Sequence, residues 1–132
     1  MDVEWRQMEQ PAYVTAVVTP GASTVCEIAL TVRNSNAAPR GPTMFYLFLS
    51  DSPIGAALTA VTASGAVNVK AGGFGSDILA LFSKKAILAQ TLGNGTYVLS
   101  ITDAAKSPFK VCVQLDGVAQ VVATLATASY GP

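Results

Sequence analysis

Few side chains in this chain could transfer protons, attack a substrate or hold a metal. The chain has 132 residues with no histidine, two cysteines and eight acidic residues. Without histidine, neither a Ser-His-Asp nor a Cys-His arrangement can be built. A zinc site would have to combine Cys26 and Cys112 with carboxylates, and it would lack the short-spaced ligand pairs typical of such sites. We therefore expect no metal and no cofactor.

The carboxylates most suited to acid-base chemistry stand at the ends of predicted strands or in turns. They are Asp51, Asp77, Asp103 and Asp116. Aspartate is common there because its carboxylate accepts hydrogen bonds from nearby backbone N–H groups. A paired-carboxylate hydrolase is the alternative, and a calcium site would lack the ordered run of oxygen ligands of an EF-hand loop. We expect turn roles and no enzymatic activity.

One glycine-rich segment superficially resembles a phosphate-binding loop. Gly72-Gly73-Phe74-Gly75 lacks the following Lys and Ser or Thr of that motif, and no amphipathic helix follows it. The segment is therefore predicted to be an ordinary loop. Phe74 at its tip either folds back over the core or is offered to a neighbouring molecule.

The elements that must position these residues are strands, because apolar residues recur with a period of two. In 24–33 the alternation places Cys26, Ile28, Leu30 and Val32 on one face. The segment 43–50 is apolar on both faces, which predicts a central strand or one whose outer face is covered by a partner. Further β-rich runs are 13–19, 86–91, 96–102, 109–115 and 118–127, with two short strands in 58–70 and either a strand or a helical turn at 78–83.

Turn signals separate these runs. Leu92-Gly93-Asn94-Gly95 predicts a hairpin between 86–91 and 96–102, and Asp116-Gly117 predicts one between 109–115 and the last strand. Turn signals recur about every eight to twelve residues, as in sandwiches and barrels. The sequence thus predicts an all-β chain, a single antiparallel β-sandwich of Ig-like or jelly-roll order with about eight to nine strands. The domain spans 12–132, and residues 1–11 form a short N-terminal arm.

Cellular context follows from the cysteines and from the absence of targeting signals. Cys26 is in phase with Ile28, whereas Cys112 lies between Val111 and Val113 and so points the other way from them. The N-terminus has no apolar region of a secretory signal. The uncharged stretches 52–69 and 117–132 are interrupted by polar residues and therefore predict no membrane span. We expect free thiols in a protein made in the cytoplasm.

Charge is sparse and balanced. Eight basic residues match eight acidic ones, and charged residues make up 12% of the chain, against roughly 25% in typical soluble domains. This balance excludes nucleic acid and anionic membranes as expected partners. So little charge suggests that part of the surface contacts another protein. Candidate anchors, which could instead pack against their own domain, are Trp5, Met8, Tyr13, Phe74 and Tyr130.

Tyr97, in the strand Gly95 to Ile101, resembles the Gly-x-Tyr strand of immunoglobulin-like and fibronectin-like domains. The resemblance implies a ring packed in the core and a hydroxyl bonded to the backbone. Leu99 stands where antibody domains carry a cysteine, so Cys26 and Cys112 are not expected to form an inter-sheet bridge.

Several short motifs together resemble capsid decoration, or cement, proteins of tailed bacteriophages. They are Trp5-Arg6-Gln7, Phe48-Leu49-Ser50-Asp51, Gly95-Thr96-Tyr97, Ile101-Thr102-Asp103 and Ser129-Tyr130-Gly131. The resemblance implies a structural virion protein, made in the host cytoplasm, that binds the major capsid protein on the capsid surface and self-associates in the particle. The alternative is an Ig-like binding module of a phage tail, fibre or baseplate that recognises glycan through the loops 34–42 and 71–76.

Overall fold

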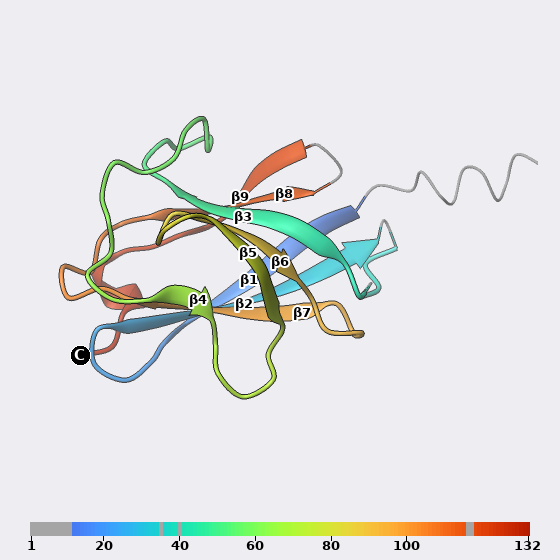
Figure 1. The fold of residues 1–132 in the computed structure, drawn as a ribbon, viewed down its shortest axis with the longest axis horizontal. Helices are drawn as coiled ribbons and strands as arrows, with labels where there is room; N and C mark the ends of the chain where they lie inside the picture. Colours follow the sequence, from blue (N-terminus) through green and yellow to red (C-terminus); the bar gives the residue numbers. More distant parts are fainter. Residues whose placement is uncertain (1–11, 35, 40, 116–117) are drawn as a thin grey trace, which may run out of the picture.

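Nine strands in two packed sheets make up the fold (Figure 1). The computed structural model describes residues 12–34, 36–39, 41–115 and 118–132, so the predicted arm 1–11 lies outside the described residues. The strands are β1 (Ala12–Pro20), β2 (Val25–Asn34), β3 (Met44–Ser50), β4 (Val67–Val69), β5 (Ser76–Phe82), β6 (Ala86–Gln90), β7 (Thr96–Thr102), β8 (Lys110–Leu115) and β9 (Val118–Thr124). A short 3₁₀ helix, η1 (Thr127–Ser129), follows β9. The predicted antiparallel β-sandwich is confirmed.

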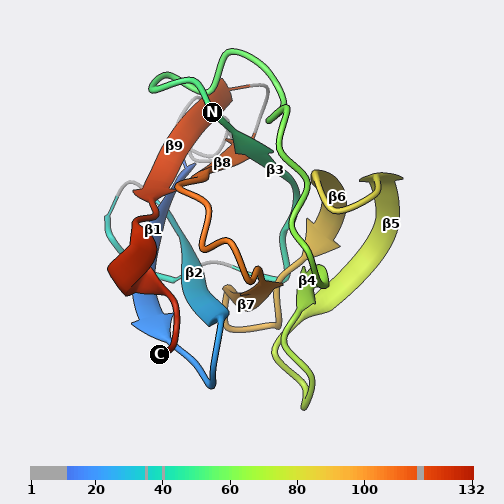
Figure 2. The ribbon, with the colours of Figure 1, turned by 90° about the vertical axis from the view of Figure 1, so that its left-hand side faces the viewer.

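Strand order defines two sheets of unequal size. The four-stranded sheet has the order β1-β2-β7-β4, and the five-stranded sheet has the order β5-β6-β3-β8-β9. The blocks β1-β2-β7 and β3-β8-β9 follow the A-B-E and C-F-G order of immunoglobulin sandwiches, although β4 precedes the β5–β6 hairpin here. Figure 2 shows β1 and β9 together on one side of the sandwich and β4 and β5 on the other.

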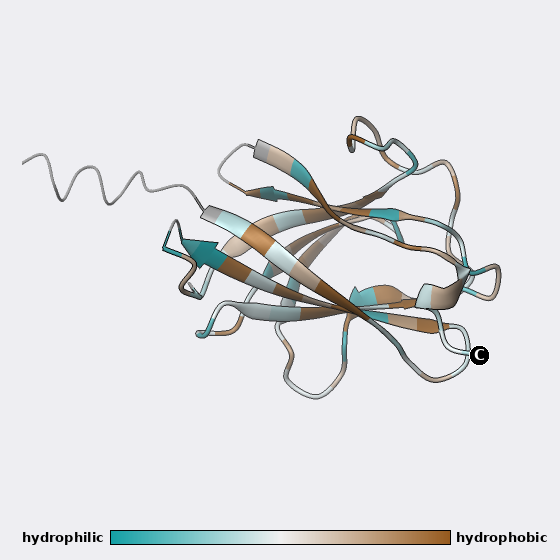
Figure 3. Cartoon of the chain, turned by 180° about the vertical axis from the view of Figure 1, so that it is seen from behind, coloured by the Kyte–Doolittle hydropathy of each residue, from teal (hydrophilic) through white to brown (hydrophobic). Residues whose placement is uncertain are grey.

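The alternating segment 24–33 forms β2 and supplies one wall of the core. Cys26, Ile28, Leu30 and Val32 are buried, as predicted. In register on β7, Ile101, Leu99 and Tyr97 lie opposite the first three. Alternating hydropathy along the strands is visible in Figure 3. The period of two therefore places one face of each strand between the sheets.

The other wall of the core is built around β3, which pairs with β6 on one side and β8 on the other. Phe45, Leu47 and Leu49 are buried, and the ring of Phe45 meets Tyr97 edge to face with centroids 5.4 Å apart. The prediction of a central strand at 43–50 is confirmed.

The hairpin predicted at Leu92-Gly93-Asn94-Gly95 is wrong. β6 belongs to the five-stranded sheet and β7 to the four-stranded sheet, so this segment carries the chain from one sheet to the other. A hairpin within one sheet and a connection between two sheets show the same alternation and the same turn residues. Neither signal specifies which strands pair. The second predicted hairpin is confirmed, since β8 and β9 pair with Leu115 opposite Val118.

Two further segments differ from the sequence-based expectation. The region 58–70 contains β4 alone among strands, because the segment before it forms loop hydrogen bonds such as Thr59 N–H to Leu49 O, 2.8 Å. β9 ends at Thr124 and not at Thr127, where η1 begins. The ambiguous segment 78–83 belongs to a strand, β5.

Tyr97 links the two sheets through a side chain. Its hydroxyl donates to Asp77 Oδ1 on β5 (2.5 Å), and Val69 N–H on β4 donates to Asp77 Oδ2 (2.9 Å). The backbone acceptor implied by the immunoglobulin-like resemblance is therefore wrong, and the acceptor is a carboxylate. Gly75 makes the approach possible, because a Cβ there would lie 2.6 Å from the Tyr97 ring.

Asp103 fastens the loop that follows β7. Its carboxylate is buried and accepts hydrogen bonds from the backbone N–H groups of Ser107 (2.9 Å), Ala105 (3.2 Å) and Ser64 (3.3 Å). Nearby, the hydroxyl of Tyr130 donates to Ser107 O (2.7 Å). Burial alone would raise the pKa of Asp103, but these hydrogen bonds together lower it.

The Tyr97 contact can be tested with Tyr97→Phe, which keeps the ring and removes the donor. We expect the free energy of unfolding at neutral pH to fall by about 1–2 kcal/mol, against about 3–5 kcal/mol for Tyr97→Ala. Burial, followed by the bond to Asp77, raises the pKa of Tyr97. Wild-type stability should therefore decline once the pH exceeds the ordinary tyrosine pKa, and less steeply in Tyr97→Phe. Urea unfolding at several pH values measures both effects, and identical alkaline slopes would contradict the assignment.

Asp103 should control stability in acid. Because its pKa is lowered in the folded protein, its contribution is complete above the ordinary aspartate pKa and is lost as the pH falls through the folded value. We expect Asp103→Ala to cost about 2–3 kcal/mol at neutral pH, since buried N–H groups lose their acceptor. Asp103→Asn should flatten the acid limb of a plot of unfolding free energy against pH. An unchanged acid limb would show that other carboxylates dominate.

Candidate interaction surface

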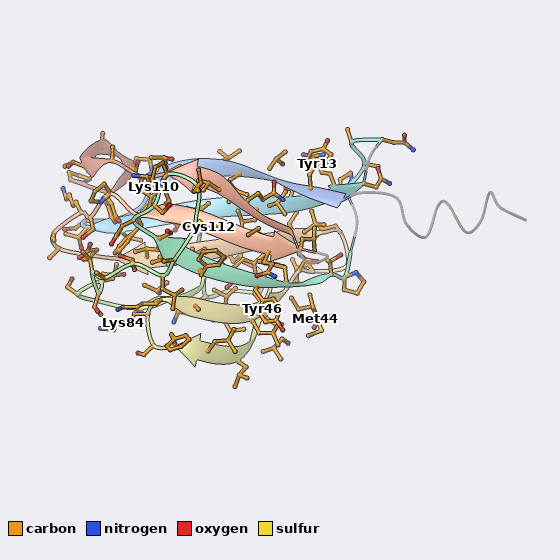
Figure 4. All side chains as sticks on the ribbon, turned by 90° about the horizontal axis from the view of Figure 1, so that it is seen from above. Tyr13, Met44, Tyr46, Lys84, Lys110 and Cys112 are labelled. Carbon is orange, nitrogen blue, oxygen red and sulfur yellow. The ribbon has the colours of Figure 1, made fainter. Side chains whose placement is uncertain are left out.

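Both thiols are buried and free. Cys26 points from β2 into the core. Cys112, labelled in Figure 4, lies on the outer face of the five-stranded sheet, where a Cβ on Gly55 would sit 3.0 Å from its Sγ. Burial raises the pKa of each thiol to about 11, with the charge of Glu27 adding to the effect at Cys26. The expectation of free thiols is confirmed, and neither is a thiolate nucleophile at neutral pH.

The described carboxylates of the candidate acid-base set act as acceptors that position loops. Asp51 accepts from the Thr59 hydroxyl (2.6 Å) and from Ala60 N–H (2.9 Å), which lowers its pKa. Asp77 and Asp103 hold the contacts given above. Their partners include residues far along the chain, so their role extends beyond the local turns predicted. No group of three or more metal-ligating side chains comes together among the described residues, and Asp116 lies outside them.

The five sequence-predicted anchors are not brought together within the part of the chain that the structure describes. Trp5 and Met8 lie outside that part. Tyr13 is half-buried on β1, opposite Arg33 on β2. Tyr130 is buried within its own domain.

Phe74 is also partly covered by its own chain. Lys70 Nζ lies 4.7 Å from the centroid of its ring, and Phe74 O accepts a hydrogen bond from Val98 N–H on β7. Phe74 was the aromatic residue of the loops considered for glycan recognition, and its half-buried ring leaves only part of its surface for a sugar.

An exposed apolar surface lies elsewhere, on the outer face of the five-stranded sheet. Its exposed members are Met44 and Tyr46 on β3 and Leu79 and Phe82 on β5, between 47% and 60% exposed. We call these four residues the apolar face. Figure 4 shows Met44 and Tyr46 toward one end of the sheet and the positively charged Lys84 and Lys110 toward the other.

Strand register makes the apolar face continuous. Tyr46 lies opposite Leu88 on β6, and Leu88 lies opposite Leu79 on β5. Phe82 lies opposite Ala86, which in turn lies opposite Phe48. Residues directly opposite one another on neighbouring strands point to the same side of the sheet. The exposed side chains are therefore rows of one surface and not scattered residues.

The outer face of the four-stranded sheet has a different character. Thr15, Thr31 and Thr96 form one row across β1, β2 and β7. Glu27 pairs with Lys70 at 3.1 Å over the same sheet. The same sheet also exposes Val17, in a row with Ala29 and Val98, so its outer face mixes polar and apolar rows, whereas the five-stranded sheet exposes more large apolar side chains.

One sequence signal pointed to this surface. The segment 43–50 is apolar on both faces, which predicted either a central strand or a face covered by a partner. β3 is central, and its outer face still exposes Met44 and Tyr46. The contribution of β5 was missed because the assignment of 78–83 stayed open between strand and helical turn.

Comparisons with family models, curated proteins and solved structures found no match to this chain. No helix within the described residues is long and apolar enough to cross a membrane. The surface chemistry of the sandwich is therefore what indicates a function.

Proposed function

We propose that this chain is a structural virion protein that docks on the major capsid protein lattice and stabilises a phage head, without catalysis or a cofactor. The observation that carries the proposal is the apolar face of Met44, Tyr46, Leu79 and Phe82. The resemblance to decoration proteins supplies the identity of the partner and the location on the capsid surface. The protein would be made in the host cytoplasm and would join the shell there.

The apolar face has the properties of a docking surface. Burial of apolar area contributes roughly 25 cal/mol per Å², and aromatic and Met side chains are frequent anchors at protein interfaces. Tyr46 projects from a strand paired on both sides, and the neighbouring Phe45 and Leu47 are fixed in the core. A rigid platform loses little conformational entropy on binding, so more of the contact energy appears as affinity.

The charges of the described residues agree with a protein partner. Asp51, Asp77 and Asp103 are engaged as acceptors by their own chain, and the full sequence has zero net charge. Within the described part of the chain, these contacts leave none of the three carboxylates free to form an acid–base pair, and the zero net charge of the sequence does not favour nucleic acid.

Docking can be tested by sedimentation with undecorated capsids. Wild-type protein should co-pellet saturably. Tyr46→Lys should weaken binding about tenfold to a hundredfold, because it places a charge at the centre of the buried contact. The matched control is Val17→Lys, which adds the same charge at an exposed valine on the outer face of the four-stranded sheet.

Circular dichroism should show that both variants retain the fold. Equal binding by Tyr46→Lys and wild type would exclude the apolar face, and a complete lack of binding by wild type would exclude the capsid role. Labelling of the native particle at the tail would favour the alternative of a tail, fibre or baseplate module.

A further inference from the structure

The edge strand β5 is exposed and lacks the residues that usually prevent an edge from pairing with another strand. All seven residues Ser76–Phe82 are exposed, and Ile78, Leu79, Leu81 and Phe82 are 47%, 56%, 40% and 60% exposed. No charge or proline stands between Ile78 and Phe82. Native edge strands are normally protected by such residues, because an open edge pairs readily with another strand.

We propose that β5 pairs antiparallel with β5 of a second copy of this chain, joining the two five-stranded sheets into one. The opposite side of the sandwich is less open to such pairing, because β1 and β9 lie together there and η1 contacts β1. On the other side of the sandwich, where β4 and β5 lie, β5 is the longer of the two edge strands, with seven residues against three.

Charge favours the antiparallel arrangement. Asp77 stands near the start of β5, and Lys84 and Lys85 follow its end. Antiparallel pairing brings Asp77 of one copy near the Lys84–Lys85 end of the other, with its carboxylate still bound to Tyr97 and Val69 of its own chain, whereas parallel pairing would place like charges together. Such a two-fold contact is self-complementary, as closed dimers require.

The area predicts a weak dimer. Four side chains of roughly 150–200 Å² each, about half exposed, offer on the order of 350 Å² per copy, and Leu79 and Phe82 keep part of this area on the outward face. Specific interfaces bury about 1,200–2,000 Å² in total. The pair should therefore form reversibly in solution and persist where a lattice holds two copies side by side.

Two irregularities in β5 shape the contact. Its register with β6 shifts between Asp77 and Leu79 and again between Ala80 and Phe82. Ile78 and Leu81 fall at these shifts and have no directly opposed residue on β6. Bulges increase strand twist and shorten regular pairing, so side chains would supply much of the contact. The outward side chains Leu79 and Phe82 stay on the apolar face, which pairing would extend across two copies.

Sedimentation velocity over a range of concentrations tests the proposal on the full chain. Wild type should show a monomer–dimer equilibrium. The double variant Ile78→Lys/Leu81→Lys should raise the dimer dissociation constant about a hundredfold, by replacing apolar contact with like charge around the two-fold axis. Both positions lack an opposed residue on β6, so the fold should be kept, as circular dichroism would show. Val17→Lys is the control and should dimerise like wild type.

A cross-link gives an independent readout. Ala80 lies near the middle of β5. Under a mild oxidant, the variant Ala80→Cys should give a disulfide-linked dimer, whereas Val17→Cys should not. The native thiols do not compete, because both are buried. A monomer at all concentrations, or a dimer insensitive to the β5 variants, would overturn the proposal.

The capsid assay separates this proposal from the proposed function. Dimerisation without capsid binding would support β5 pairing and exclude the capsid role. A monomeric wild type whose capsid binding is lost in Ile78→Lys/Leu81→Lys would overturn self-pairing and assign the β5 edge to the capsid protein.

Discussion

The carboxylate of Asp77 joins the two sheets at the start of β5, a strand that otherwise pairs only with β6. The carboxylate of Asp77 receives the hydroxyl of Tyr97 and the N–H of Val69, both from the four-stranded sheet. These two hydrogen bonds hold the first residues of β5, an otherwise exposed edge strand, against the four-stranded sheet. Because the Tyr97 ring also packs on Phe45, the core and the edge are positioned by the same residue. The free edge, and the part of the apolar face that Leu79 and Phe82 contribute, both depend on where β5 lies.

The two outer faces of the sandwich differ in polarity. One row of threonines and an ion pair give the four-stranded sheet a partly polar outer face. The five-stranded sheet presents Met44 and Tyr46 on β3, which is paired on both sides, and Leu79 and Phe82 on the edge strand β5. The low charge content of the sequence therefore appears in the structure as exposed apolar side chains on the five-stranded sheet and also at Val17 and Ile54 elsewhere.

The sequence predicted strands well because alternation depends on local chemistry, as in Cys26 to Val32. It failed at Leu92 to Gly95, because the same turn residues serve a hairpin and a crossing between sheets. The partner of Tyr97 could not be found either, since Asp77 lies 20 residues away and is brought near only by the packing of the two layers. The sequence indicates only in part that Met44 and Tyr46 are exposed, because a strand that is apolar on both faces does not reveal whether its outer face is covered.

Because Gly55 packs closely against Cys112, the reactivity of this thiol depends on local motion of the segment around Gly55. Gly55 has a positive φ of 69°, and even a methyl group there would crowd the sulfur. An alkylating reagent attached to that sulfur needs far more room, so it can react only after the segment around Gly55 has swung away. The rate at which Cys112 is alkylated therefore reports how often this segment opens. A partner bound on this side of the sheet would lower that rate.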